Sequence, residues 1–329
     1  MDTSKIRTFF RNWILAGTAG TFVRTVTCPI ERVKIIIQTQ DLSPQFRELG
    51  IHPYKGFWDC FNRVRQEQGL LSYWRGNFAN MVRYLPSVAF SFAFNDLFKE
   101  YIAPESLRSV SLINRLGREM LCGALAGFSA HTLVQPIRLC HTLMCADVSS
   151  CRVFTGLSNC ILQVYNHYGI SGLYSGYSCS VFGMSLYRSV YFGIFKTSKY
   201  YAESYYGSRP PFIVMWPLAQ VGTLLAGCLS YPFDTISRNQ QMSLYPCGPG
   251  GSQRSLTETV RQLIQSKGLF ALYKGVSINS VRSVGSSLVL VLYDEIQFRF
   301  FRSKEKDVNS LVTFEQRQYW KTQIPGKGE

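Results

Sequence analysis

The sequence has few charged residues, few acids relative to bases, and no closely spaced pair of cysteines. Charged residues make up 17% of the 329 residues, and 35 Lys and Arg against 20 Asp and Glu leave a net charge of +15. So low a charge content beside 19 Tyr and 23 Phe excludes a disordered chain. The ten cysteines contain no Cys-x-x-Cys pair, the usual start of zinc and redox motifs, so we expect no metal and no cofactor.

Signals for targeting, catalysis and nucleic-acid recognition are absent as well. The first residues lack the hydrophobic core of a signal peptide, so we expect no cleavable address. The basic excess admits nucleic acid, an anionic membrane or an anionic small molecule, but no nucleic-acid recognition module is present. The four histidines suggest no triad that the sequence supports. We therefore expect neither an enzyme nor a nucleic-acid partner.

What the chain does contain is an internal repeat of roughly 100 residues. Three weakly charged segments lead to Pro29, Pro136 and Pro232, and an aromatic-x-Gly triplet follows each proline about half a repeat later. These triplets are Trp74-Arg75-Gly76, Tyr174-Ser175-Gly176 and Tyr273-Lys274-Gly275. We expect repeats at residues 1–108, 109–208 and 209–302, followed by a polar C-terminal tail at 303–329.

Each repeat holds two apolar segments with a short amphipathic stretch between them. The amphipathic stretches, 58–66, 157–164 and 256–264, have helical spacing, and the uncharged run from 210 to 233 is long enough to span a bilayer. A mean hydropathy of 0.00 is compatible with membrane helices that line a wet cavity. The sequence predicts an all-α membrane protein with six transmembrane helices around a central cavity; the alternative is a soluble all-helical repeat protein.

The repeated motifs resemble those of the mitochondrial carrier family. The matching features are Pro-x-acid-x-x-base, as in residues 29–34, and aromatic-basic-Gly half a repeat later, and the resemblance covers residues 8–301. Within that family the chain is most similar to the ADP/ATP carriers, at 73–86, 230–235 and 290–296. Where those carriers have Arg-Arg-Arg-Met-Met-Met, this chain has Ser237-Arg238-Asn239-Gln240-Gln241-Met242.

The resemblance implies a multi-pass carrier of the mitochondrial inner membrane that exchanges adenine nucleotides by alternating access, with its three short amphipathic helices on the matrix side. Arginines within apolar segments suit a phosphate-bearing anion. Tyr187 either stacks on a purine or packs against a neighbouring helix. The implied substrate-binding residues are Arg24, Arg83, Gly183, Met184, Tyr187, Arg188, Ser230, Asn279 and Arg282.

The resemblance also implies two ionic gates. At the matrix end the pairs are Glu31–His141, Arg138–Ser237 and Asp234–Lys34, of which only the last is a full ion pair. At the cytoplasmic end they are Asp96–Lys199, Lys196–Gln297 and Asp294–Lys99. In both gates the bond between the second and third repeats is expected to be lost, because a base faces a neutral group there.

The expected loss of two gate bonds leaves a second function open. The alternative to nucleotide exchange is a non-transporting carrier-fold subunit of a larger inner-membrane complex, of the respiratory-chain type. The tail either binds such a partner or is solvated. Cardiolipin is a further implied partner, at Gly76, Gly176 and Gly275, because backbone amides at the start of a helix suit a lipid phosphate.

Overall fold

A computed structural model describes residues 3–48, 50–102, 112–148, 153–206, 212–245 and 253–285 of the chain. All regular secondary structure in these ranges is helical, which confirms the predicted all-α class. Residues 1–286 form one compact unit. Within the described ranges, no helix combines the length and the apolar character that a membrane span requires.

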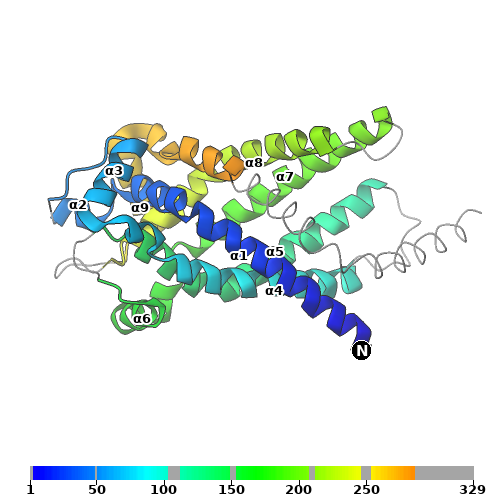
Figure 1. Cartoon of the computed structure of the whole chain (residues 1–329), viewed down its shortest axis with the longest axis horizontal. Helices are drawn as coiled ribbons and strands as arrows, with labels where there is room; N and C mark the ends of the chain where they lie inside the picture. The colour runs from blue at the N-terminus through cyan, green and yellow to red at the C-terminus, as the bar shows by residue number, and fades with distance from the viewer. Residues whose placement is uncertain are drawn as a thin grey trace, which may run out of the picture. The chain divides into compact units, whose positions relative to one another are not determined.

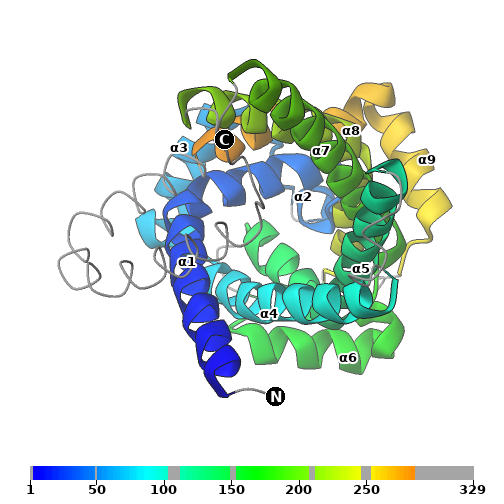
Figure 2. The ribbon, with the colours of Figure 1, turned by 90° about the vertical axis from the view of Figure 1, so that its right-hand side faces the viewer.

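Long helices form the frame of this unit. They are α1 (Thr3–Thr39), α4 (Asn77–Ile102), α5 (Leu112–Ala146), α7 (Tyr177–Tyr206) and α8 (Phe212–Met242), and residues 276–285 are also helical. Figure 2 shows these helices standing around a common axis. α4 packs against α5, α7 packs against α8, and α1 packs against both α4 and α8. Neighbours in the frame therefore often come from different repeats.

The three repeat prolines lie inside long helices instead of ending them. Pro29 is within α1, Pro136 within α5 and Pro232 within α8. A proline removes one backbone hydrogen bond, which normally kinks or breaks a helix. In α1 the residues after Pro29 are fully buried, including Val33 and Ile35 at 0% exposure, so packing holds the helix together beyond the proline. The long helices consequently extend well past the predicted apolar segments.

The short helices gather at one end of the frame (Figure 1). They are α2 (Pro44–Glu48), α3 (Phe57–Gln68), α6 (Leu157–Leu173) and α9 (Leu256–Lys267), with 3-10 helices η1 (Leu70–Trp74) and η3 (Gly268–Tyr273). The three predicted amphipathic stretches fall on α3, α6 and α9. Each of these helices buries a pair of residues four positions apart: Cys60 with Val64, Cys160 with Val164, and Thr259 with Leu263.

The best-packed apolar core lies at this end and fixes the ends of α1, α5 and α8. One buried cluster joins Ile35 of α1, Leu139 of α5, Cys160 of α6 and Met242 of α8. Because these side chains are close-packed, the three helix ends have little freedom to shift relative to one another. The core thereby positions the polar residues that follow the prolines.

Buried polar contacts join the first repeat to the other two at the same end. Arg32, at 0% exposure, donates from Nε to the carbonyl of Cys145 at 3.2 Å and from Nη2 to that of Asp147 at 2.7 Å. In the turn after η3, Lys274 Nζ lies 2.7 Å from both carboxylate oxygens of Asp41. Burial lowers the pKa of Lys274, and Asp41 opposes that shift. The two bonds to Asp41 link the third repeat to the first.

Candidate functional site

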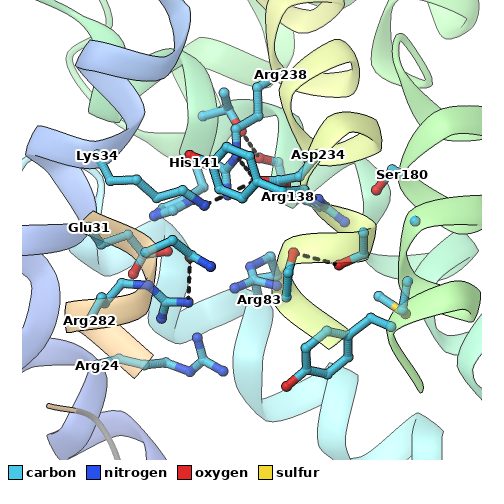
Figure 3. Close-up of a pocket in the computed structure, with 18 residues that line it drawn as sticks. Arg24, Glu31, Lys34, Arg83, Arg138, His141, Ser180, Asp234, Arg238 and Arg282 are labelled. Carbon is cyan, nitrogen blue, oxygen red and sulfur yellow. Dashed lines mark hydrogen bonds and ion pairs between the residues drawn. The ribbon is translucent and has the colours of Figure 1, made fainter. Parts of the chain in front are cut away.

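A cavity of about 410 Å³ opens between the long helices, and its walls carry far more positive than negative charge. Six cationic side chains line it: Arg24, Lys34, Arg83, Arg138, Arg238 and Arg282. Glu31 and Asp234 are the two carboxylates, so the lining has an excess of four positive charges. The neutral residues include Ser180, Gly183, Met184, Tyr187, Ser230, Asn279 and His141. Figure 3 shows the charged groups pointing into one space from several helices.

Arg83 and Arg282 occupy matching places in the first and third repeats. Arg83 Nη2 donates to Asn80 Oδ1 at 2.7 Å, and Arg282 Nη2 donates to Asn279 Oδ1 at 3.3 Å. In both cases the asparagine precedes the arginine by three residues, so the two side chains share a helix face. In both repeats the asparagine amide thus holds the arginine through one guanidinium nitrogen.

Arg24 is held by an aromatic ring. Its guanidinium carbon lies 4.1 Å from the centroid of the Tyr84 ring, and the pair brings α1 against α4. A cation over an aromatic face is attracted by the ring quadrupole and keeps its hydrogen-bond donors. Among the described residues, the buried Nε of Arg24 has no hydrogen-bond partner. The ring of Tyr84 thus holds Arg24 where it lines the cavity.

The second repeat lines the cavity with small and aromatic residues where the others have arginine. Gly183 and Met184 are in the lining, and Tyr187 is one turn further along α7. The Tyr187 and Tyr191 rings are stacked with centroids 6.2 Å apart, and the Tyr191 and Phe195 rings are stacked at 5.7 Å. The three rings therefore form a continuous stack along α7, with Tyr187 at the cavity.

Arg188 lies elsewhere. It is not among the residues that line the cavity, and its Nη1 donates to the carbonyl of Gly123 on α5 at 3.1 Å. A Cβ at Gly127 would lie 2.1 Å from the same Nη1, so the small residues of α5 make room for the guanidinium. The expected place of Arg188 among the substrate-binding residues is corrected for this reason: the adjacent helix backbone satisfies its donor.

Asp234 forms ion pairs with cationic side chains of three helices, at the end of the cavity nearest the short helices. The predicted Lys34–Asp234 ion pair is present at 3.1 Å. Arg138, which was expected to face Ser237 without a bond, instead pairs with Asp234 at 3.3 Å. Arg238 of α8 lies 3.0 Å from the same carboxylate. The expected loss of a bond between the second and third repeats at this gate is therefore wrong: a guanidinium that gains nothing from a neutral serine pairs with the nearby acid.

Glu31 and His141, the third matrix-gate pair, both line the cavity but bond to other groups. Asn80 Nδ2 donates to Glu31 Oε2 at 3.2 Å, so Asn80 connects Glu31 to Arg83. His141 Nε2 lies 3.3 Å from Cys145 Sγ, one turn along α5. Each member of this gate pair thus contacts a neighbour in its own repeat: Glu31 contacts Asn80, and His141 contacts Cys145.

The cytoplasmic gate falls mostly outside the described residues. Asp294 and Gln297 lie beyond residue 285, and the side chains of Lys196 and Lys199 are also outside the description. Asp96 and Lys99 lie on α4, where neither is buried.

Sequence reasoning missed two polar residues: Ser180, which lines the cavity, and His131, which contacts Ser180. Ser180 lines the cavity, and its Oγ lies 2.7 Å from His131 Nε2. A signal for Ser180 was available, because it follows Gly176 by four residues just as Asn80 follows Gly76 and Asn279 follows Gly275. His131 has no counterpart of this kind, and only the structure identifies it.

The glycines expected to bind cardiolipin lie just before helices and adopt a left-handed backbone. Gly76 precedes α4 with φ of 80°, Gly176 precedes α7 with 71°, and Gly275 precedes the helix at 276–285 with 85°. A Cβ would approach Cys145 Sγ at Gly76, the Ser237 carbonyl at Gly176 and the Tyr231 hydroxyl at Gly275. Each glycine therefore permits a close contact with a neighbouring helix.

The described helices therefore define an all-α protein with a cavity lined mainly by cationic side chains. The family model described as mitochondrial carrier protein matches residues 6–106, 114–205 and 209–304. The chain belongs to the mitochondrial carrier family, whose members are carriers and not enzymes.

Curated relatives are similar over almost their full length. The ADP,ATP carrier protein of Parachlorella kessleri is 39% identical over 88% of this chain and 84% of its own. A mitochondrial substrate carrier family protein, ancA, of Dictyostelium discoideum is 38% identical over 89% of this chain and 94% of its own. Human ADP/ATP translocase 3 is 36% identical over 90% of this chain and 99% of its own. These similarities support a carrier function.

Proposed function

We propose that this chain exchanges adenine nucleotides across the mitochondrial inner membrane by alternating access, as a multi-pass protein that performs no chemistry. The observation that carries the proposal is the cavity with an excess of four positive charges. Cations that converge on one cavity favour a polyphosphate over a neutral or singly charged solute. The names of the relatives, ADP,ATP carrier protein and ADP/ATP translocase, agree with this choice of substrate.

In this proposal the two halves of a nucleotide meet different walls of the cavity. Arg24, Arg83 and Arg282 bind the phosphates, because all three line the cavity and carry positive charge. Tyr187 stacks on the purine, and Gly183 belongs to the same wall, where the absence of a side chain lets Phe233 of α8 pack closely. Met184, Ser230 and Asn279 complete the site; Arg188, bound to the α5 backbone, supports the wall instead.

The proposal includes two gates, three repeats and a lipid. The matrix gate contains Glu31, Lys34, Arg138, His141, Asp234 and Ser237, and the cytoplasmic gate contains Asp96, Lys99, Lys196, Lys199, Asp294 and Gln297. The repeats occupy residues 1–108, 109–208 and 209–302. Cardiolipin phosphates bind the helix starts after Gly76, Gly176 and Gly275, where the first amides lack helical partners.

Exchange in liposomes tests the function. Purified protein in liposomes preloaded with ADP should take up labelled ADP or ATP, and Arg83→Ala should lower uptake by about tenfold or more, because a charge-assisted bond to phosphate is lost. Arg65→Gln is the matched control: Arg65 is exposed on α3, away from the cavity, so its loss should leave exchange intact.

Two outcomes would contradict this function. One is the absence of uptake of any adenine nucleotide by the wild type beside an active ADP/ATP carrier in the same preparation. The other is equal uptake by the Arg83→Ala variant and the wild type. Folded wild-type protein that transports nothing but migrates with a large complex on native gels would support the alternative, a non-transporting assembly subunit. The Arg138–Asp234 ion pair removes one reason for that alternative, because the matrix-gate bond expected to be missing has a substitute.

A further inference from the structure

Asp234 is the point at which three helices of the frame meet electrostatically. Its Oδ1 accepts from Arg138 Nη2 of α5 at 3.3 Å, while Oδ2 accepts from Lys34 Nζ of α1 at 3.1 Å and from Arg238 Nε of α8 at 3.0 Å. Gln38 of α1 adds a fourth donor to Oδ2 at 3.3 Å. A carboxylate offers about four lone-pair sites, so this acid is fully used. Figure 3 shows the cations converging on it.

A buried histidine holds Arg138 in this position. Arg138 Nη1 lies 3.1 Å from Nε2 of His131, which is two turns earlier on α5 and 3% exposed. A guanidinium only donates, so Nε2 is the acceptor and the ring is the neutral tautomer with its proton on Nδ1. Ser180 Oγ of α7 lies 2.7 Å from the same nitrogen. The ring also stacks on Tyr177, with centroids 6.2 Å apart. Contacts from α7 thus fix the imidazole that orients Arg138.

Ser237, the residue in register with Arg138 in the family's gate, has a different contact. Its Oγ donates to the carbonyl of Gly176 at 2.8 Å, at the start of α7. It therefore anchors a helix start and leaves Asp234, three residues earlier on α8, as the acid that Arg138 reaches. One turn of α8 separates the two positions, so the bond between the second and third repeats has moved by about one helical turn.

We propose that Arg138–Asp234 is the working bond between the second and third repeats in the closed matrix gate, and that His131 is its positioning residue. The inference rests on the proposed exchange function and adds to it the residue pair that closes this interface. One acid then serves two interfaces at once, through Lys34 and Arg138, so opening the gate breaks both bonds in a single event. Removing Asp234 leaves three buried cations without their shared acid, whereas removing Arg138 leaves the acid still paired twice.

Thermal unfolding of the purified full chain tests the pairing through three double-variant cycles. Arg138→Gln should lower Tm by about 2–4 °C, because the ion pair with Asp234 is lost. In the Asp234→Asn background it should have little further effect, because the partner is already gone. In the Ser237→Ala background its effect should be undiminished, because Ser237 is not the partner. In the His131→Leu background the effect of Arg138→Gln on Tm should again be small, because Arg138 has already lost the imidazole that positions it.

The opposite pattern overturns the inference. If Arg138→Gln is additive with Asp234→Asn, or if its effect disappears with Ser237→Ala, Arg138 is not bound to Asp234 in the closed gate. Should Asp234→Asn fail to accumulate as folded protein, the Ser237 and His131 cycles decide the question without it.

A transport measurement separates positioning by His131 from general packing. His131 does not line the cavity, so His131→Leu should leave the KM for ADP unchanged. It should raise the maximal exchange rate by about threefold, because the weakened gate opens more readily. His131→Gln, which keeps an acceptor oxygen toward Arg138, should restore the wild-type rate. An unchanged or lower rate in His131→Leu, or no restoration by glutamine, contradicts the positioning role. If the wild type exchanges no nucleotide but the Tm cycles hold, the proposed function fails and the ion pair stands.

Discussion

Tyr84 connects a glycine on α1 to a cation in the cavity. Its ring lies over Arg24, with the guanidinium carbon 4.1 Å from the centroid. A Cβ built on Gly20, one turn before Arg24, would lie 2.2 Å from the same ring. The ring fits between the two residues only because position 20 has no side chain. A single absent methyl group therefore determines where one of the proposed phosphate-binding groups points.

The substitution Gly20→Ala tests this arrangement. The added methyl group displaces the Tyr84 ring, so the variant loses a cation–π contact of about 0.5–2 kcal/mol and gains strain of about 1–3 kcal/mol. We expect a lower Tm and a higher KM for ADP. The control is Gly193→Ala on α7, where the glycine is exposed and nothing lies within 4 Å of the place that the methyl group would occupy. That change should leave Tm the same or slightly higher, because alanine favours helix. A Gly20→Ala variant as stable as Gly193→Ala would refute the argument.

The three short amphipathic helices do not begin in the same way. Ser255 caps α9, because its side chain accepts a hydrogen bond from the Glu258 amide at 3.2 Å. Helices α3 and α6 follow Gly56 and Gly156, which have no side chain to offer. The serine satisfies one of the amides that a helix start leaves without a partner. The start of α9 is consequently stabilised locally, while those of α3 and α6 depend on their buried faces.

We expect Ser255→Ala to destabilise the protein by about 1 kcal/mol and Ser255→Gly by only a few tenths. Glycine removes the side-chain acceptor as alanine does, but it lets water and the backbone satisfy the free amide more easily. Chemical denaturation of the two variants beside the wild type measures the difference. An alanine variant as stable as the wild type would show that the cap contributes nothing at this helix start.

Across the whole unit, the same glycine recurs at each contact between successive repeats. Gly76 meets Cys145 of the second repeat, Gly176 meets Ser237 of the third, and Gly275 meets Tyr231 and Lys34, the latter from the first. The contact at Gly176 is the tightest to backbone, since a Cβ would lie 2.6 Å from the Ser237 carbonyl oxygen. That carbonyl belongs to α8, so it cannot yield without moving the helix. At Gly176 the two backbones therefore approach so closely that only glycine fits between the second and third repeats.

Gly176→Ala should therefore destabilise the protein by more than the strain of a left-handed backbone alone would. Gly69 is the matched control, because it has a φ of 79° but nothing within 4 Å of the position of a Cβ. We expect Gly69→Ala to cost about 1–2 kcal/mol from backbone strain, and Gly176→Ala about 1–3 kcal/mol more from the clash with the carbonyl. Denaturation midpoints of the two variants measure this, and equal losses would contradict a role for Gly176 in the contact between repeats.

The architecture was largely predictable, because the motifs that define it recur at a regular spacing along the chain. The prolines, the aromatic-x-Gly triplets and the amphipathic stretches recur with a common period, and the structure has an amphipathic helix at each predicted stretch. Helix ends were less predictable. Thr39 ends α1 well beyond Pro29, because the burial of Val33 and Ile35 outweighs the local preference of proline to end a helix.

The sequence by itself determined the all-α threefold plan and the excess of cations, since period and composition do not depend on how side chains pack. Only the tertiary structure decided how those cations are used. Arg138 and Arg188 look alike in sequence, yet one pairs with Asp234 at 3.3 Å and the other binds the Gly123 carbonyl at 3.1 Å. The physical reason is that a long side chain binds the acceptor that the neighbouring helix brings within reach, and α8 and α5 present different acceptors.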